Sequence, residues 1–361
     1  MTTNHIPQSI LRVIDASEDR CREGLRVLDD VARLMLDDSA LTAKLRDARH
    51  MLASAIQPLG NALLSARDAE SDVGASESSP SAAHADVTAL VRANARRAEE
   101  ALRTLEEFAR LPEVDGFFDS GKLSNVRFLV YDLERELVGR LSRQAAVAKI
   151  TGVYVILDPA MTRDRPMLEV AEAALAGGAT VIQYRDKVRE KGLQLPIAIE
   201  LRELCHRYGA LLIINDDPAL TLASGADGVH LGQKDLPISA ARAILPLSCI
   251  IGNSNATLDE VRAADAEGAD YIAVGAIYDT SSKSDTRPAG LETLRQVRAI
   301  TKRPIVAIGG INADNVAPVI EAGADAVSVI SAVVGATDPR AATELLLQRI
   351  EAQRERSGPR A

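Results

Sequence analysis

Three polar side chains at alternate positions follow a short apolar run in the middle of the chain. Residues 182–187 read IQYRDK, and Gln183, Arg185 and Lys187 share one face if this segment is extended, because successive side chains of a strand point to opposite sides. Asp186 then points to the other face, where we expect a salt bridge or a cap. An amide and two cations on one face are suited to binding an anion, although a solvated sheet edge has the same pattern.

Carboxylates follow two later apolar runs. Asn215 ends the run ALLIIN and Asp216 follows it, and Asp235 lies three residues after the run 226–232, which contains His230. Two carboxylates beside cations are suited to Mg²⁺ bound to a diphosphate, because Mg²⁺ needs only one or two protein carboxylates and takes its other ligands from phosphate and water. Helix capping is the alternative for both acids, and we interpret His230 as a hydrogen-bonded core residue.

A third group of residues fits a phosphate site. Gly309 and Gly310 end one apolar run, and Ser331 ends the next. Glycines let a backbone approach an anion closely, and barrel enzymes hold phosphates at such positions, although a tight turn needs the same residues. Further polar candidates at run ends and in the loop YDTSSKSDTRPAG are Ser254, Thr280, Ser282 and Lys283.

The elements that carry these residues alternate between strands and helices after residue 150. Sequences such as AGGAT and EAGAD place Gly at helix ends directly before apolar strands, which is typical of βαβ units. Eight such units predict a (β/α)8 TIM barrel, with the chemistry at the carboxyl ends of the strands. An open doubly wound sheet is the alternative. The eight predicted strands cover residues 152–159, 180–187, 210–217, 226–232, 249–255, 269–278, 303–310 and 324–331.

The first 148 residues have a helical pattern instead. EGLRVLDDVAR and EALRTLEEFAR share Glu, Leu, Arg and Ala at matching positions, which indicates an internal duplication of two helices that pack as a pseudo-symmetric pair. We therefore predict an all-α domain over 1–148 with a disordered loop near 65–86, a barrel over 149–352 and a flexible tail over 353–361. A fragment that begins near Ala148 is expected to be active without the helical domain.

Composition narrows the class of protein. The chain of 361 residues has a net charge of −9 and no Trp, which argues against general nucleic-acid binding. Its three cysteines have no metal-binding spacing, and no apolar stretch is long enough for a membrane span or a secretory signal. We expect a cytoplasmic enzyme with small-molecule partners, no nucleic acid and no membrane, and the sequence leaves open whether it forms a homo-oligomer.

The motifs together resemble one family. QYRDK, INDD, ADGVHLGQKDLP, IGNSN, GADYIAVGAIYDTSSK and VAIGGINADN occur in the order and spacing of thiamine-phosphate synthases, over about residues 150–350. That family joins a pyrimidine diphosphate to a thiazole phosphate and releases pyrophosphate. The resemblance implies that Asp216 and Asp235 bind Mg²⁺. It implies a pyrimidine diphosphate site of Gln183, Arg185, Lys187, Asn215, Ser254 and Lys283, and a thiazole phosphate site of Thr280, Ser282, Gly310, Ile330 and Ser331.

Small departures from the family pattern leave the charged groups in place. Ser282 replaces a threonine, Tyr184 and Asp186 replace Leu and Glu, and Asn253 replaces a small apolar residue. Two alternatives stay open: a thiazole phosphate isomerase or regulator of the same barrel family, and a phosphosugar epimerase-type barrel. The first 148 residues resemble the helical extension of some bacterial synthases, for which phosphorylation of the pyrimidine phosphate is a proposed role.

Overall fold

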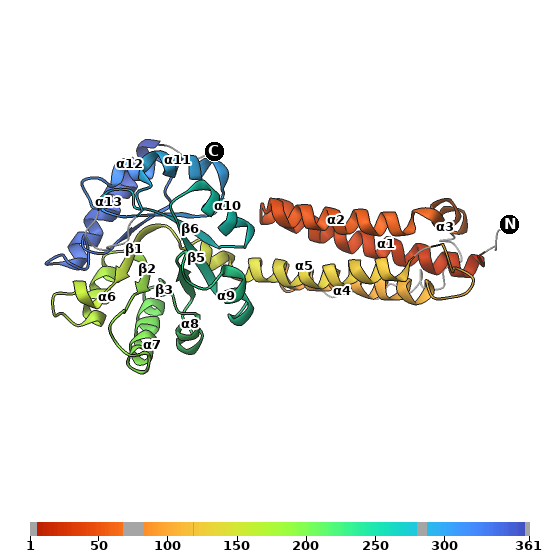
Figure 1. Ribbon diagram of the computed structural model, residues 1–361, viewed down its shortest axis with the longest axis horizontal. Helices are drawn as coiled ribbons and strands as arrows, with labels where there is room; N and C mark the ends of the chain where they lie inside the picture. Colours follow the sequence, from red (N-terminus) through yellow and green to blue (C-terminus); the bar gives the residue numbers. More distant parts are fainter. Residues whose placement is uncertain (1–5, 68–82, 118, 280–286, 358–361) are drawn as a thin grey trace. The chain divides into compact units, whose positions relative to one another are not determined.

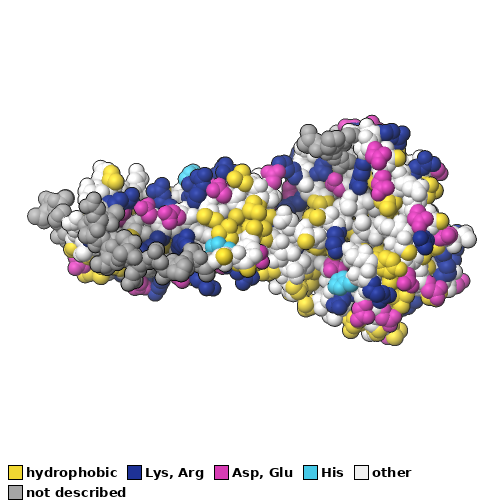
Figure 2. Space-filling model, turned by 180° about the vertical axis from the view of Figure 1, so that it is seen from behind, with side chains coloured by type: hydrophobic (Ala, Val, Ile, Leu, Met, Phe, Trp, Pro, Cys, Tyr) yellow, Lys and Arg dark blue, Asp and Glu magenta, His cyan; other side chains and the backbone are white. Residues whose placement is uncertain are grey.

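The computed structural model describes residues 6–67, 83–117, 119–279 and 287–357. The chain forms two compact units, Met1–Ser142 and Arg143–Ala361. The first consists of helices, and the second alternates strands and helices (Figure 1). In the part of the chain that is described, no helix combines the length and the apolar character needed to span a membrane. Charged side chains of both signs are interspersed on the face of each unit drawn in Figure 2, without a continuous basic patch on the residues described there.

The helices of the first unit begin where the sequence provides caps. The Asp38 side chain accepts from Leu41 N at 3.1 Å, and the Asp86 side chain accepts from Ala89 N at 2.7 Å, each at the start of a helix. A π-helical turn, η1 (Val31–Met35), follows α1, and a 3₁₀ turn, η2 (Gln57–Leu59), precedes α3. The helices are α1 (Gln8–Asp30), α2 (Ser39–Ile56), α3 (Gly60–Ala66), α4 (Val87–Phe108) and α5 (Ser120–Val147), of which α5 continues into the second unit.

Helices α1 and α4 pack closely against each other. Gly24 of α1 lies so close to α4 that a Cβ atom there would be 2.7 Å from the carbonyl oxygen of Asn94. Matching buried acids each bind an arginine of the next helix: Asp29 accepts from Arg49 at 3.1 Å, and Glu106 accepts from Arg127 at 2.6 Å. These matching contacts fit the internal duplication, which stays a prediction from the sequence. Most of the predicted loop at 65–86 lies outside the described residues.

The second unit is a closed parallel barrel, which confirms the predicted fold and excludes the open sheet. All eight predicted strands are present, each within the predicted range or starting one residue before it, and most end earlier than predicted. They are β1 (Gly152–Leu157), β2 (Ala179–Tyr184), β3 (Leu211–Asn215), β4 (Gly228–Leu231), β5 (Ile250–Asn255), β6 (Tyr271–Val274), β7 (Ile305–Ile308) and β8 (Ala326–Val329).

Helices surround the barrel between successive strands (Figure 1). They are η3 (Pro159–Met161), α6 (Met167–Ala176), α7 (Lys191–Arg207), α8 (Pro218–Ser224), α9 (Ile238–Ile244), α10 (Leu258–Ala266), α11 (Gly290–Ile300), α12 (Val316–Glu321) and α13 (Pro339–Ser357). The sequence predicts a flexible tail from residue 353, whereas α13 continues to Ser357. Arg354 explains the difference, because its guanidinium donates back to the Thr151 hydroxyl at 2.9 Å and to the Asp325 carbonyl oxygen.

Alternation along the strands separates two cores. Ile182 and Tyr184 of β2 pack between barrel and helices, whereas Val181 packs inside the barrel among side chains such as Tyr154 and Tyr271. Gln183 also points inward, because its amide nitrogen donates to the Tyr154 hydroxyl at 2.7 Å. The predicted alternation on this strand is therefore correct up to Tyr184, where the strand ends.

A candidate active site at the carboxyl ends of the strands

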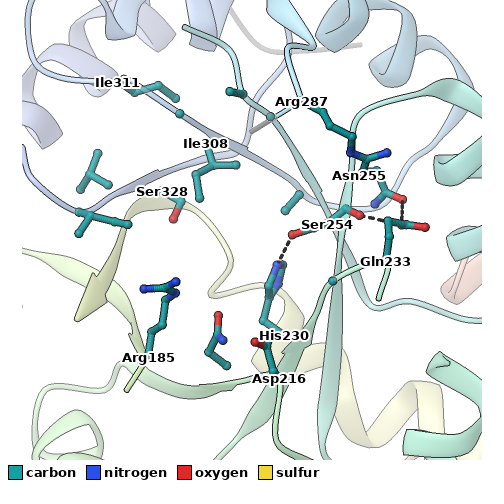
Figure 3. Close-up of a pocket in the computed structure, with 18 of the residues that line it drawn as sticks. Arg185, Asp216, His230, Gln233, Ser254, Asn255, Arg287, Ile308, Ile311 and Ser328 are labelled. Carbon is teal, nitrogen blue, oxygen red and sulfur yellow. Dashed lines mark hydrogen bonds between the residues drawn. The ribbon is translucent and has the colours of Figure 1, made fainter. Parts of the chain in front are cut away.

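A cavity of about 470 Å³ opens at the carboxyl ends of the barrel strands (Figure 3). It brings together most of the residues that the sequence predicts for the site: Arg185, Lys187, Asn215, Asp216, Asp235, Ser254, Gly310, Ile330 and Ser331. Gln183 is not among the lining residues, because it is buried beneath the cavity against Tyr154. Thr280, Ser282 and Lys283 lie outside the described residues.

Arg185 is held at the cavity wall by an acid from the neighbouring strand. Its backbone N–H continues the sheet by donating to Leu157 O at 3.0 Å, one residue beyond the end of β2. Its guanidinium donates to Asp158, whose other carboxylate oxygen accepts from Ala160 N at 3.0 Å. Asp158 fixes the direction of this cation, and the sequence analysis did not identify it. The motif LDP placed an acid at a strand end, but its pairing with Arg185 follows from the register of β1 and β2.

Lys187 lies in the loop after β2, not on the strand that the sequence predicts. Its ammonium group nevertheless reaches the site and donates to Asp216 at 2.5 Å. Asp216 has a φ of 62°, a left-handed conformation that is rare outside glycine, and its N–H donates to His230 O at 2.8 Å. Strained residues of this kind often occur at functional sites.

Asp216 and Asp235 form an interacting pair of carboxyl groups. Burial opposes ionisation of Asp216, but hydrogen bonds from Lys187 and with Asp235 lower its pKa. Burial and the neighbouring Asp216 raise the pKa of Asp235, although its side chain accepts from Gly232 N at 2.7 Å. Two carboxyl groups that disfavour each other's charge are a fitting place for a divalent cation. Among the residues that the structure covers, no cluster of three or more His, Cys, Asp or Glu could hold a metal alone. This donor set is therefore suited to Mg²⁺ whose remaining ligands come from a phosphate.

The glycines after β7 bring backbone to the cavity. Gly309 and Gly310 have φ values of 105° and 64°, and a Cβ at Gly310 would lie 2.5 Å from the carbonyl oxygen of Asp279. Asn315 supports this turn by donating to Gly310 O at 2.9 Å. Ile330 and Ser331 border the same side of the cavity. The geometry requires glycine at both positions, and it leaves room for a small anion beside the turn.

Several lining residues were missed by the sequence analysis. Arg287 lies beside Asn255 and Gln233 in Figure 3 and forms an ion pair with Glu260 of α10. The Gln233 amide donates to Asn253 Oδ1 at 3.0 Å and to Ser254 O at 2.8 Å. The first bond gives a hydrogen-bond partner to the side chain of Asn253, which replaces a small apolar residue of the family pattern. Arg287 lies within the polar loop YDTSSKSDTRPAG that the sequence analysis singled out, so the signal was present, but nothing in the sequence pairs it with Glu260.

Asp186 forms a salt bridge, as the sequence predicts, and Asp217, the acid that follows Asp216, caps a helix. Asp217 caps α8 by accepting from Leu220 N at 2.9 Å and pairs with Lys191. Asp186 accepts from Val188 N and Arg189 N, both at 3.0 Å, and from the Arg189 guanidinium at 2.7 Å. Its side chain is 0% exposed, however, so the Asp186–Arg189 ion pair is not a pair of two exposed groups. The buried carboxylate holds the loop that carries Lys187 in its conformation.

The closed barrel and the cationic, carboxylate-bearing cavity at its carboxyl-terminal rim define a (β/α)8-barrel enzyme for phosphorylated small molecules. Comparisons with known proteins identify the family within this class of enzyme. A model of the thiamine monophosphate synthase family matches residues 153–333, and a model of the ThiD2 family matches residues 12–136. The chain belongs to the thiamine-phosphate synthase family, and its helical unit contains the ThiD2 region.

Two curated relatives match almost the whole chain, and one solved structure matches about half of it. The thiamine-phosphate synthase of Synechocystis sp. is 40% identical over 95% of this chain and 97% of its own length. The thiamine-phosphate synthase of Nostoc sp. is 39% identical over 96% of this chain and 95% of its own length. Among solved structures, thiamine phosphate pyrophosphorylase from Pyrococcus furiosus is 42% identical, with a TM-score of 0.53 over 57% of this chain and 98% of that one.

Proposed function

We propose that the cavity joins a pyrimidinylmethyl diphosphate to a thiazole phosphate and releases pyrophosphate, which makes thiamine phosphate. The observation that carries this proposal is the convergence of Arg185, Lys187, Asp216 and Asp235 in one cavity beside the glycine turn at Gly310. A diphosphate and a monophosphate both need anion-binding groups, and the two groups of residues border one space. An isomerase or a regulator that binds only the thiazole phosphate has no use for the paired carboxylates and cations.

The chain's residues act by charge and position. In the reaction, the carbon–oxygen bond to the diphosphate breaks, pyrophosphate leaves with the electron pair, and the thiazole nitrogen forms the new carbon–nitrogen bond. In this reaction no proton has to be removed by a side chain. Arg185, held by Asp158, and Lys187 stabilise the negative charge that develops on the leaving group. The residues at Gly310 and Ser331 hold the second substrate within reach of the reacting carbon.

We propose that Asp216 and Asp235 hold Mg²⁺ together with the diphosphate. When bound, this cation would neutralise charge on the leaving pyrophosphate. The hydrogen bond from Lys187 keeps Asp216 in place for this role, and the backbone N–H of Gly232 orients Asp235.

An omission experiment tests this function. The purified full chain is incubated with Mg²⁺ and each phosphorylated substrate alone, then with both, and pyrophosphate is measured. Release only with both substrates is the expected result. Conversion of the thiazole phosphate without the pyrimidine diphosphate would favour the isomerase alternative instead.

We propose that the helical unit acts on the pyrimidine phosphate that precedes the synthase substrate. The match of residues 12–136 to the ThiD2 family supports this assignment. Incubating the full chain with the pyrimidine monophosphate, ATP and the thiazole phosphate should give thiamine phosphate, and a chain that lacks the helical unit should not. Equal product from both would assign the helical unit another role.

A further inference from the structure

A continuous series of side-chain hydrogen bonds crosses the barrel interior beneath the cavity. Gln183 Nε2 donates to the Tyr154 hydroxyl at 2.7 Å, and this hydroxyl lies 2.9 Å from that of Tyr271. The Tyr271 hydroxyl lies 3.0 Å from His230 Nδ1, and His230 Nε2 lies 2.8 Å from the Ser254 hydroxyl. These five side chains, which we call the relay, come from five different strands. Figure 3 shows its last link, between His230 and Ser254.

One direction of donation gives every hydroxyl hydrogen within the relay an acceptor. Burial raises the pKa of both tyrosines above the ordinary value, so each hydroxyl keeps its one hydrogen. Tyr154 accepts from Gln183, so in this direction its own hydrogen goes to the Tyr271 oxygen, and the Tyr271 hydrogen goes to His230 Nδ1. If Nδ1 accepts the Tyr271 hydrogen, the ring hydrogen lies on Nε2, which donates it to Ser254. The Ser254 oxygen is thus an acceptor within the relay, and its own hydrogen is left for the cavity.

The barrel is built to accommodate this arrangement. A Cβ atom on Gly252 would lie 1.9 Å from Cζ of Tyr271, so only glycine at this position of β5 leaves room for the ring. The Tyr271 ring stacks on the His230 ring, with centroids 5.6 Å apart and an angle of 25° between the planes. Tyr271 therefore reaches both Tyr154 and His230 from the middle of the barrel, and the imidazole is held in one orientation.

We propose that the relay fixes Ser254 as a hydrogen-bond donor to an acceptor atom on the heteroaromatic ring of the substrate. Tyr271 and His230 are positioning residues for Ser254 in this role, and Gln183 sets the direction from the far end. This inference rests on the proposed function for the identity of the substrate, but the state of His230 does not depend on it. A site of this kind selects a ring nitrogen that carries a lone pair and disfavours a ring N–H at the same place, because two donors would face each other.

The first test observes His230 directly. Nitrogen NMR of the full chain labelled with ¹⁵N-histidine reports which ring nitrogen carries the hydrogen, and a His230→Gln variant assigns the signal among the five histidines. We expect the Nε2–H tautomer in the wild type and a mixture of tautomers in Tyr271→Phe. An Nδ1–H tautomer in the wild type would overturn the proposed direction, whether or not the chain makes thiamine phosphate.

The second test is kinetic. Tyr271→Phe and Ser254→Ala should each raise the KM for the pyrimidine diphosphate about tenfold, as expected for one lost hydrogen bond, and the double variant should be no worse than Ser254→Ala. Tyr208→Phe, which removes a hydroxyl from the exposed end of α7, is the control and should leave KM unchanged. Fully additive effects of Tyr271→Phe and Ser254→Ala would show that Tyr271 does not act through Ser254.

A second, independent observation concerns Ser328 of β8. Its side chain is 4% exposed and lines the cavity, yet its hydroxyl has no hydrogen-bond partner within the described part of the chain. A buried hydroxyl without a partner is unfavourable, and a substrate in the cavity would remove this penalty. In Figure 3 Ser328 is drawn to the left of Ser254, on the same side of the view as Arg185. We infer that Ser328 forms a hydrogen bond with a polar atom of the bound substrate.

Replacing Ser328 should weaken substrate binding without lowering the stability of the fold. Ser328→Ala should leave the melting temperature unchanged or higher, because the unsatisfied hydroxyl is gone, but should raise the KM of one substrate roughly fivefold. Ser224→Ala is the matched control: the Ser224 hydroxyl is equally buried but donates to Leu220 O at 2.7 Å, away from the cavity. That variant should lose stability and keep its KM. A lower melting temperature with unchanged KM values in Ser328→Ala would overturn the inference.

Discussion

Arg143 offers a sharp test of how the barrel is held together at its amino-terminal end. Arg143 lies near the end of α5 and donates to Asp270 at 2.8 Å and to Leu247 O at 2.7 Å. The arginine side chain is 5% exposed and that of Asp270 is 2% exposed. The other oxygen of Asp270 accepts from Arg242 at 2.5 Å and from Ile251 N at 2.8 Å. Asp270 therefore ties the end of α5 and the helix α9 to the starts of β5 and β6.

The contacts of Arg143 indicate how far Arg143→Met should lower the free energy of unfolding of the barrel. Removing one partner of a buried ion pair costs about 3–5 kcal/mol. Because Asp270 keeps Arg242 and the Ile251 N–H, we expect a loss near the lower end, about 3 kcal/mol in the free energy of unfolding of the barrel. That is a large fraction of the roughly 5–15 kcal/mol that a domain has in total. Methionine conserves most of the buried volume, so the loss reports on the polar contacts.

Hydrogen exchange measures this loss where it should occur. Peptides that cover β5 and β6 should exchange faster in Arg143→Met at a given pH and temperature, because local opening becomes easier. Arg262→Met is the control, since Arg262 pairs with Asp259 on the surface, where the side chains are 60% and 93% exposed. It should change stability by less than about 1 kcal/mol. Equal protection of β5 and β6 in the two variants would refute the reasoning.

Further predictions concern the active site and its supports. Asp216→Asn or Asp235→Asn should raise the Mg²⁺ concentration needed for half-maximal rate and lower turnover while leaving thermal unfolding unchanged; full activity at the same Mg²⁺ concentration would remove these residues from the metal site. Arg185→Ala or Lys187→Ala should lower kcat roughly 30- to 1,000-fold in steady-state kinetics, because each removes charge that stabilises the leaving group. Burial opposes ionisation of Asp186, but hydrogen bonds from Arg189 and Val188 outweigh it and lower its pKa. The stabilisation is thus present above the unfolded-state pKa and lost as the pH falls through the folded-state pKa. Asp186→Asn should therefore melt at a lower temperature than the wild type near neutral pH, and the two should converge in acid.

The predicted independence of the barrel stays a prediction, and Arg143 sharpens its test. A fragment that begins near Ala148 omits Arg143, whereas the second compact unit begins with it. We expect a fragment that starts a few residues before Arg143 to be more stable to urea than one that starts at Ala148. Equal stability of the two fragments would show that the contacts of Arg143 contribute little.

Short-range patterns were sufficient to predict the barrel and much of the cavity rim. The alternation of apolar residues and the Gly-ended helices gave all eight strands, and strand ends then indicated residues such as Asn215 and Ser254. These inferences work because side-chain direction in a strand depends on neighbours in sequence. Lys187 shows the limit, because the strand ends at Tyr184 and a loop, organised by the buried Asp186, directs Lys187 to Asp216.

Contacts between residues on different strands or loops could not be predicted. Asp158 with Arg185, Arg287 with Glu260, and the relay through Tyr271 each join segments that are distant in sequence. The partner of each residue depends on the register of the closed barrel. The reason for glycine at position 252 is apparent only in the structure, because the Tyr271 ring occupies the space that a Cβ atom would fill. The sequence interpretation of His230 as a hydrogen-bonded core residue is confirmed, but its place between Tyr271 and Ser254 required the structure.

The most direct test of the account is to measure both products of the purified full chain in one reaction. With the pyrimidine diphosphate, the thiazole phosphate and Mg²⁺ present, we predict that thiamine phosphate and pyrophosphate appear in equal amounts. Arg185→Ala should slow both to the same extent. Pyrophosphate release without thiamine phosphate, or no release at all from a folded chain, would contradict the assignment of this cavity as the site where the two substrates are joined.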